Sequence, residues 1–168
     1  MVRLARALPL SAFVVYALTA TALLAAPGTN LVTNPSFAEA GGKTGFQDWG
    51  LSVRGGAPKY RVVQEDGGPC LFAEFEPRDM LYLDRSLPLA EHGQYRLTYR
   101  CKLKAAGARA PSLMCRVSRQ SEGLWRAWAD ASPDVVDEWQ TLTLDFVVPS
   151  GKGGVGLRFM MNTSQNAG

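Results

Sequence analysis

The stretch QYRLTYRCKLKA, Gln94 to Ala105, alternates apolar and polar side chains along its whole length. Neighbouring side chains on a strand point to opposite sides of its sheet, so this alternation predicts a strand with one buried and one wet side. The buried side would carry Tyr95, Leu97, Tyr99, Cys101 and Leu103. The wet side would carry Arg96, Thr98, Arg100, Lys102 and Lys104. Such a half-buried strand is typical of an antiparallel sheet.

The same pattern recurs along the chain after Gly28, where helical periodicity is almost absent. Turn-forming clusters such as EDGGP, EHG, ASPD and PSGKGG separate the alternating segments. Besides 94–105, six further segments are predicted strands: 59–65, 70–76, 80–87, 112–119, 138–148 and 154–162. The chain is therefore predicted to be all-β.

Seven antiparallel strands with half-buried patterning favour a two-sheet antiparallel β-sandwich of the jelly-roll or immunoglobulin kind. An immunoglobulin domain would need two cysteines far enough apart in sequence to bridge its sheets, and Cys101 and Cys115 are too close together for that. The jelly roll is therefore the preferred prediction.

The three cysteines, Cys70, Cys101 and Cys115, allow at most one internal bridge. The alternation in 112–119 puts Cys115 on the core side, as it does Cys101 in the preceding strand. We therefore expect Cys101 and Cys115 to pair if a disulfide forms. The alternative is three buried thiols that behave as small apolar residues.

The N-terminus has the layout of an export signal, because Arg3 and Arg6 precede an apolar run from Ala7 to Ala26 that ends in small residues. The run is also close to the ~20 residues that span a bilayer, so an uncleaved anchor is the alternative. Residues 1–28 are thus predicted to be a signal peptide or N-terminal anchor, and residues 29–168 the sandwich. The protein would be secreted, periplasmic or at the cell surface.

The charge of the exported part is nearly balanced. Without Arg3 and Arg6 the 18 basic residues become 16, against 15 acidic ones, and no long run of like charge occurs. Nucleic-acid binding therefore loses its electrostatic basis.

Four segments in order, NLVTNPSF, FQDWGLS, SLPLAEHGQYRLTYRCKLKA and DEWQTLTLDFVVPSG, resemble the carbohydrate-binding modules of the CenC type. These are family 4/9-like domains with a galactose-binding-domain jelly roll. The matching positions in the opening segments are Asn30, Asn34, Phe37 and Trp49. The resemblance covers about residues 30–162 and implies non-catalytic polysaccharide binding, as in the targeting part of a glycoside hydrolase.

Two departures from that family pattern stand out. The resembled domains finish on a further strand after the position of Asn162, so we expect a jelly roll that lacks its last strand, as a C-terminally truncated fragment would. The family often holds a structural calcium with early and late carboxylates, but Ala38 stands where the first acid is expected. Glu39, one place later, is the candidate calcium ligand, and no other cofactor is expected.

Sugar binding needs exposed aromatic rings that stack on apolar pyranose faces. Trp125 and Trp128 lie in the polar stretch SEGLWRAWADASPD, which is predicted to be a loop, and they are the first candidates. The alternative is that either one is buried as core at the end of the sandwich. Tyr82 is a further candidate. Trp49 and Trp139 are predicted to anchor the edge of the core.

Polar side chains must also donate and accept hydrogen bonds to sugar hydroxyls. Arg100, Arg116, Ser118 and Gln120 are predicted to share one wet face of adjacent strands, which Arg158 and Asn162 would join if the last strand pairs there. The alternative is an ordinary solvated sheet face.

Catalysis finds little support in the sequence. The only histidine, His92, lies in a predicted turn, so neither a Ser-His-Asp arrangement nor a histidine zinc site can be assembled. Glu74, Glu76 and Asp79 are close in sequence but have the pattern of exposed acids on a strand and turn. We therefore predict a binding module that is not an enzyme. The alternative function is a cell-envelope structural or protein-interaction sandwich without sugar binding.

Overall fold

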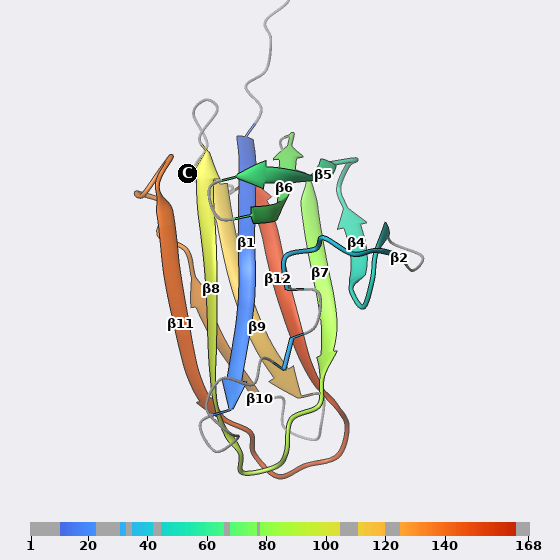
Figure 1. The fold of residues 1–168 in the computed structure, drawn as a ribbon, viewed down its shortest axis with the longest axis vertical. Helices are drawn as coiled ribbons and strands as arrows, with labels where there is room; N and C mark the ends of the chain where they lie inside the picture. Colours follow the sequence, from blue (N-terminus) through green and yellow to red (C-terminus); the bar gives the residue numbers. More distant parts are fainter. Residues whose placement is uncertain are drawn as a thin grey trace, which may run out of the picture.

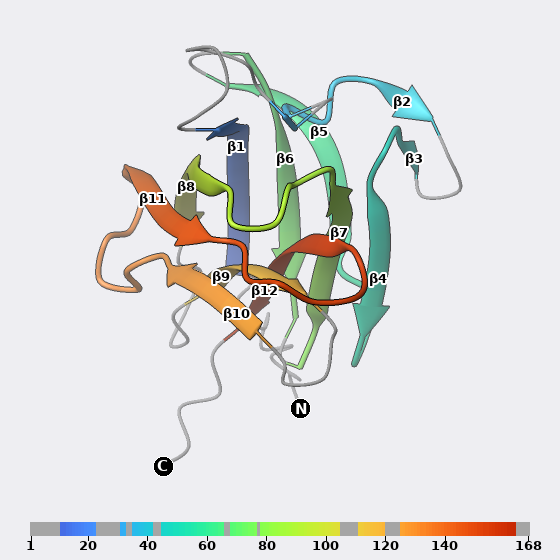
Figure 2. The ribbon, with the colours of Figure 1, turned by 90° about the horizontal axis from the view of Figure 1, so that it is seen from below.

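The computed structural model describes residues 11–22, 31–32, 35–41, 45–65, 68–76, 78–104, 111–119 and 125–163. Over these ranges the chain forms antiparallel sheets and no helix, and Figures 1 and 2 show two layers of strands facing each other. The prediction of an all-β, two-sheet antiparallel sandwich is therefore confirmed. The described part also contains no helix with the length and apolar character that a bilayer span requires.

The first sheet has the strand order β11-β8-β1-β6-β5, and all its neighbours are antiparallel. Its strands are β11 (Trp139–Val147), β8 (Gln94–Lys104), β1 (Ser11–Ala22), β6 (Gly68–Phe75) and β5 (Lys59–Glu65).

The second sheet has the order β10-β9-β12-β7-β4, again antiparallel throughout. Its strands are β10 (Trp125–Asp130), β9 (Pro111–Arg119), β12 (Val155–Thr163), β7 (Met80–Leu87) and β4 (Gly50–Arg54). A short pair, β2 (Ala40–Gly41) and β3 (Gly45–Phe46), stands apart from both sheets.

The core lies between the two sheets, where the inward side chains of both are buried. The predicted inner side of β8 is buried along its whole length, as its alternation requires. Tyr99 meets Phe159 of β12 edge-on at 5.3 Å between ring centroids, and its hydroxyl donates to the Ala129 carbonyl at 2.9 Å. Burial of these apolar side chains supplies the main stabilisation of the fold.

All seven predicted strands are present, with ends within two residues of the expected ones. β4, β10 and the β2–β3 pair were not predicted. β10 runs through the stretch that was expected to be a loop around Trp125 and Trp128. The stretch WRAWAD does not alternate strictly, because the apolar Trp128 stands at an outward position, so the pattern gave no strand signal.

The segment predicted to be an export signal contains β1, the central strand of the first sheet. β1 lies between β6 and β8, and its register sets Val15 opposite Leu71 on one side and Cys101 on the other (Figure 1). A long apolar run fits the middle of a sheet as well as it fits a signal peptide. The structure thus gives this segment a structural role, while its role in export stays a prediction.

The cysteines are free thiols in the structure, and all three are buried. Cys101 lies on β8 and Cys115 on β9, which belong to different sheets, so the expectation that they share one face of neighbouring strands was wrong. Burial raises the pKa of Cys70 to about 11 and that of Cys101 to about 12, and it raises the pKa of Cys115 as well. The alternative of three buried apolar-like thiols describes the observed state.

The opening NLVTNPSF element contributes Phe37 to the core, where this side chain is 1% exposed. Its ring packs against Phe46 and Trp49 at centroid distances of 5.9 and 4.9 Å. The prediction that Trp49 is a core anchor is thereby confirmed. Asn30 and Asn34, which the resemblance also used, lie outside the described residues.

Candidate functional site: a cleft on the second sheet

An open cleft of about 960 Å³ lies on the second sheet, against the strands β4, β7, β9 and β12. Most residues that line the cleft are polar or are glycines. The exceptions are Val155 and Leu157, two core residues that border it. The lining residues are Asp48, Gly50, Asp84, Arg85, Ser86, Arg116, Ser118, Gly153, Gly154, Val155, Gly156, Leu157 and Arg158.

The strand register assembles one row of polar and aromatic side chains across the five strands. Trp128 lies opposite Arg116, Arg116 opposite Arg158, Arg158 opposite Asp84, and Asp84 opposite Gly50. Directly opposite residues on antiparallel strands share a face, so the whole row lies on the outer side of the sheet. Trp128 ends this row and is 54% exposed, more than any other large apolar side chain of the described residues.

In the next row along the strands, small residues of β9, β12 and β7 form the hollow, and Arg126 of β10 lies at the end of this row, opposite Ser118. Ser118 of β9, Gly156 of β12 and Ser86 of β7 lie opposite one another. A Cβ added at Gly156 would meet only ordinary contacts, 3.8 Å from the Arg85 carbonyl and 4.0 Å from the Ser118 carbonyl. The space above the sheet at this point is therefore open because glycine has no side chain.

Arg158 is held in place by Asp84 across the strands. Its Nε and Nη2 donate to the two carboxylate oxygens at 2.5 and 3.0 Å, and both side chains are partly exposed. This hydrogen bond to Asp84 raises the pKa of the guanidinium. The pair therefore presents a fixed donor group and a fixed acceptor group at the edge of the hollow.

Tyr82 borders this region on β7 but has little open ring surface. It is 9% exposed, and the guanidinium carbons of Arg158 and Arg54 lie 5.3 and 5.6 Å from its ring centroid. Its hydroxyl donates to the Met80 sulfur at 3.2 Å. Tyr82 thus supports the arginine beside the cleft, with its ring covered by cations.

The structure brings together several residues that the sequence predicted for one wet face. Arg116, Ser118 and Arg158 are on the same side of the second sheet, and Asn162 follows further along β12. Trp128, which was expected in a loop, joins them on this side through β10. Gln120 lies outside the described residues.

Two predicted partners are elsewhere. Arg100 is on the first sheet, where its guanidinium carbon lies 5.1 Å from the Trp139 ring centroid. The prediction that Arg100 and Arg116 share a face was wrong, because β8 and β9 follow each other in sequence but belong to opposite sheets. Trp125 is on the inner side of β10, half-buried, with its ring 5.9 Å from that of Phe146. Trp139 is half-buried among the cations of the first sheet.

Two residues of the site were not predicted from the sequence. They are Asp84, which provides the hydrogen-bond acceptor, and Gly156, which leaves the hollow open. Gly156 could have been noticed, because GVGLRFMM places a glycine at an outward position inside a strand pattern, where glycine marks a close approach to the backbone. Asp84 had no such signal, since its neighbours across the sheet come from distant segments.

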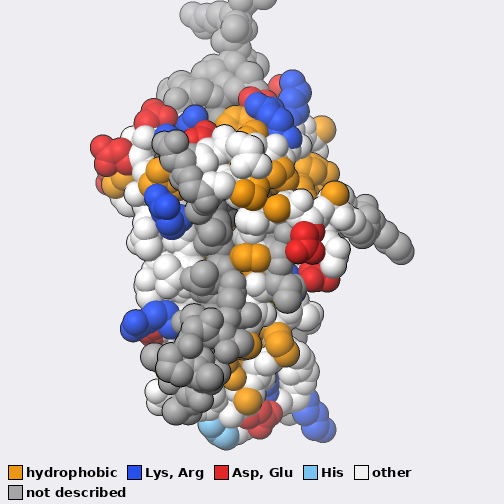
Figure 3. Space-filling view, viewed as in Figure 1, with side chains coloured by type: hydrophobic (Ala, Val, Ile, Leu, Met, Phe, Trp, Pro, Cys, Tyr) orange, Lys and Arg blue, Asp and Glu red, His pale blue; other side chains and the backbone are white. Residues whose placement is uncertain are grey.

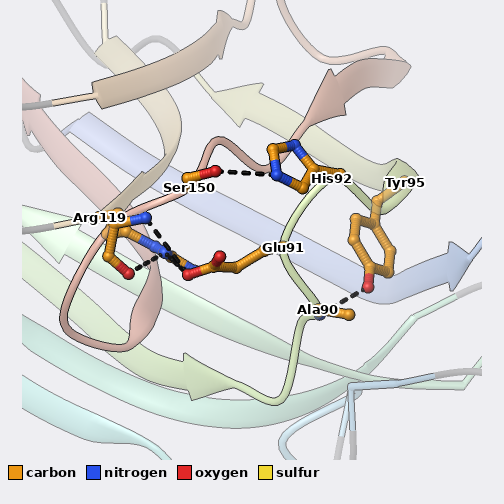
Figure 4. Close-up of polar contacts among 7 residues, drawn as sticks. Ala90, Glu91, His92, Tyr95, Arg119 and Ser150 are labelled. Carbon is orange, nitrogen blue, oxygen red and sulfur yellow. Dashed lines mark hydrogen bonds and ion pairs between the residues drawn. The ribbon is translucent and has the colours of Figure 1, made fainter.

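A separate polar cluster lies at one end of the sandwich (Figure 4). Ser150 Oγ and His92 Nε2 are 2.8 Å apart, which resembles a nucleophile and its base. The adjacent acid, Glu91, points to Arg119 instead. It accepts from Arg119 Nη1 at 2.9 Å and from the Gly151 amide at 3.2 Å, and these hydrogen bonds lower its pKa.

This end cluster joins two loops. Arg119 is 4% exposed and also donates to the Gly151 carbonyl, so it fastens the 148–154 loop to the 88–93 loop. The backbone adds hydrogen bonds from His92 to Val148 and from Val148 to Gly93, at 2.7 and 3.1 Å. We interpret the cluster as a latch between loops, because its carboxylate is occupied by arginine and cannot orient the imidazole.

The described residues contain no group of three or more histidine, cysteine, aspartate or glutamate side chains arranged to hold a metal ion. The calcium ligand Glu39 stays a prediction. On the face seen in Figure 3, basic and acidic side chains are interspersed.

No model of a known protein family matches the chain, and a search of curated proteins finds no match. The resemblance to CenC-type modules therefore stays a prediction that rests on the four ordered segments.

Proposed function

We propose that this protein is a non-catalytic carbohydrate-binding sandwich that holds a polysaccharide in the cleft of the second sheet. The observation that supports it is the row from exposed Trp128 through Arg116 and Arg158 to Asp84, beside the hollow at Gly156. An aromatic platform next to fixed donors and acceptors suits a pyranose, which has apolar C–H faces and a ring of hydroxyls.

The form of the cleft also suits a polymer. Its volume of about 960 Å³ lies at the upper end of ordinary ligand sites, and it is open along the sheet surface, so a chain could enter and leave without a terminus. The Arg158–Asp84 pair is already ordered, which lowers the entropic cost of forming hydrogen bonds to the sugar.

The wider setting of this proposal comes from the sequence. Export would bring the domain to the periplasm, the cell surface or the medium, where polysaccharides are found. It would have to keep residues 11–22 in the chain, because they form β1 of the first sheet. The proposed role needs no cofactor and no catalytic group, and it would suit the targeting part of a glycoside hydrolase.

Affinity-gel electrophoresis against soluble glucans, xylans and mannans tests the proposal. We expect retardation by at least one polymer, and Trp128→Ala should weaken that binding about tenfold or more, which corresponds to ~1.4 kcal/mol. Tyr60→Ala is the matched control, because Tyr60 is also an exposed aromatic, 38% exposed, but lies on the first sheet.

Gly156→Leu tests the cleft itself. The added side chain would project into open space, so we expect the fold to persist while binding is lost. Thr143→Leu, at an exposed position of β11, is its control. If a folded protein bound no polymer, or if Gly156→Leu bound as well as the parent, the proposal would fail, and a structural or protein-interaction sandwich would become the better hypothesis.

A further inference from the structure

The cleft contains one arginine whose charge no acid of the described chain balances. Register sets Arg116 directly opposite Arg158, so two guanidinium groups come from neighbouring strands. Arg158 is neutralised by its bidentate pair with Asp84. Arg116 makes no ion pair with any described residue, although like charges opposite each other in a sheet are destabilising.

The second aspartate at the cleft does not change this balance. Asp48 lies at the rim and pairs with Arg85, with Arg85 Nη2 3.5 Å from Asp48 Oδ2. Each of the two aspartates that line the cleft is therefore ion-paired with an arginine, Asp48 with Arg85 and Asp84 with Arg158. The cleft is left with a local excess of one positive charge, at Arg116.

Arg116 also has an unsatisfied donor. Its Nε is buried and has no hydrogen-bond partner. A buried donor without an acceptor is energetically costly. The Nε of Arg119 in the end cluster is also without an acceptor, but Arg116 differs in that it lines the open cleft and makes no ion pair with a described residue. The guanidinium is not committed to a protein acceptor at that atom, and its planar fork matches the geometry of a carboxylate.

We propose that the cleft selects acidic polysaccharides, with Arg116 binding the carboxylate of a uronic-acid residue. This inference rests on the proposed function. Trp128 and Arg116 are direct cross-strand neighbours, whose Cβ atoms in such a pair lie about 5 Å apart. A pyranose ring stacked on the indole of Trp128 would therefore bring its exocyclic carboxylate within reach of the guanidinium, while the ring hydroxyls face Ser118 and the Gly156 hollow.

The test compares each acidic polymer with its own carboxyl-reduced form, which has the same linkages and no charge. Glucuronoxylan and polygalacturonate are the two acidic probes, and isothermal titration calorimetry measures binding. We expect the acidic form of at least one to bind tenfold or more tightly than its reduced form. A sulfated polymer, dextran sulfate, is the further arm, because sulfate shares the charge of carboxylate without its planar geometry, and we expect it to bind more weakly than the preferred acidic probe.

Variants separate recognition by Arg116 from general charge attraction. Arg116→Gln should abolish the preference for the acidic form, and Arg116→Lys, which keeps the charge without the fork, should restore only part of it. Arg100→Gln removes the same charge from the opposite sheet and should leave the preference intact. Circular dichroism confirms that each variant is folded.

Three outcomes would overturn the inference. If acidic and reduced forms bound equally while Gly156→Leu still abolished binding, the acidic preference alone would be wrong and the carbohydrate site would stand. If Arg116→Gln and Arg100→Gln lost affinity equally, the effect would be long-range charge. If no polymer bound at all, the inference and the proposed function would both fall.

Discussion

Removal of residues 1–28 is the most demanding test of the fold, because this change deletes β1 from the middle of the first sheet. The same cut would be made if the N-terminal segment acted as a cleaved export signal. We expect the chain 29–168 to lose the sandwich that the full chain forms, since β6 and β8 would each be left with an unpaired edge.

The size of the effect follows from the two ladders. β1 makes six residue pairs with β6 and ten with β8. An antiparallel ladder has on average about one hydrogen bond per residue pair, each worth roughly 0.5–1.5 kcal/mol net. Losing both ladders therefore removes on the order of 10–20 kcal/mol, which is comparable to the ~5–15 kcal/mol by which a whole domain is stable.

Thermal and urea unfolding, followed by circular dichroism, measure this effect. We expect a cooperative transition for the full chain and none for the chain 29–168. Deletion of residues 1–8, which leaves Ser11–Ala22 whole, is the control and should keep the transition. A synthetic peptide of residues 11–22 added to the shortened chain should restore cooperative unfolding by refilling the gap.

A cooperative transition of the chain 29–168 within about 5 °C of the full chain's midpoint would refute the reasoning, because a loss of even a few kcal/mol shifts the midpoint further than that. N-terminal sequencing of the protein isolated from its natural source would then show directly whether β1 is kept or removed.

Three further predictions concern the core, the loop latch and the thiols. Phe159→Ala empties a fully buried site between the sheets and should lower the free energy of unfolding by about 3–5 kcal/mol in urea titrations; a loss below about 1 kcal/mol would contradict the packing. The hydrogen bond from Arg119 lowers the pKa of Glu91 below 4.5, so its stabilisation is present above that pH and is lost as pH falls through the lowered value. The melting temperature should therefore fall more steeply below pH 4.5 in the parent than in Glu91→Gln. If melting temperature depended on pH in the same way in both proteins, the contact between Glu91 and Arg119 would not stabilise the fold. Because burial raises the pKa values of Cys70 and Cys101 to about 11 and about 12, iodoacetamide at pH 8 should label them only after denaturation, as read by mass spectrometry; rapid labelling of the folded protein would refute their burial.

The alternation of apolar and polar residues was enough to predict every long strand after Gly28 and the inner and outer sides of β8. This works because the period of two in a strand is a local property of the backbone. The short strands β4 and β10 were not predicted. In β10 the apolar Trp128 stands at an outward position and breaks the alternation, and in β4 four of the five residues are exposed.

The two tryptophans of β10 show the same limit of a local sequence pattern. Trp125 and Trp128 are three residues apart on β10, one inward and one outward, and only their register with β9 assigns the sides. The apolar run in residues 11–22 has a composition that serves equally for a signal peptide and for a central strand, so composition alone could not place it in a sheet.

The sequence by itself determined the seven predicted strands and the turns between them, because an alternating pattern depends on neighbouring residues. Only the tertiary structure decided which sheet each strand joins, and this placed Arg100 and Arg116 on opposite sides of the molecule. It also aligned Trp128, Arg116, Arg158 and Asp84 from four separate strands into one row. Strand pairing is a long-range choice made by packing and backbone hydrogen bonds, and a local pattern does not contain it.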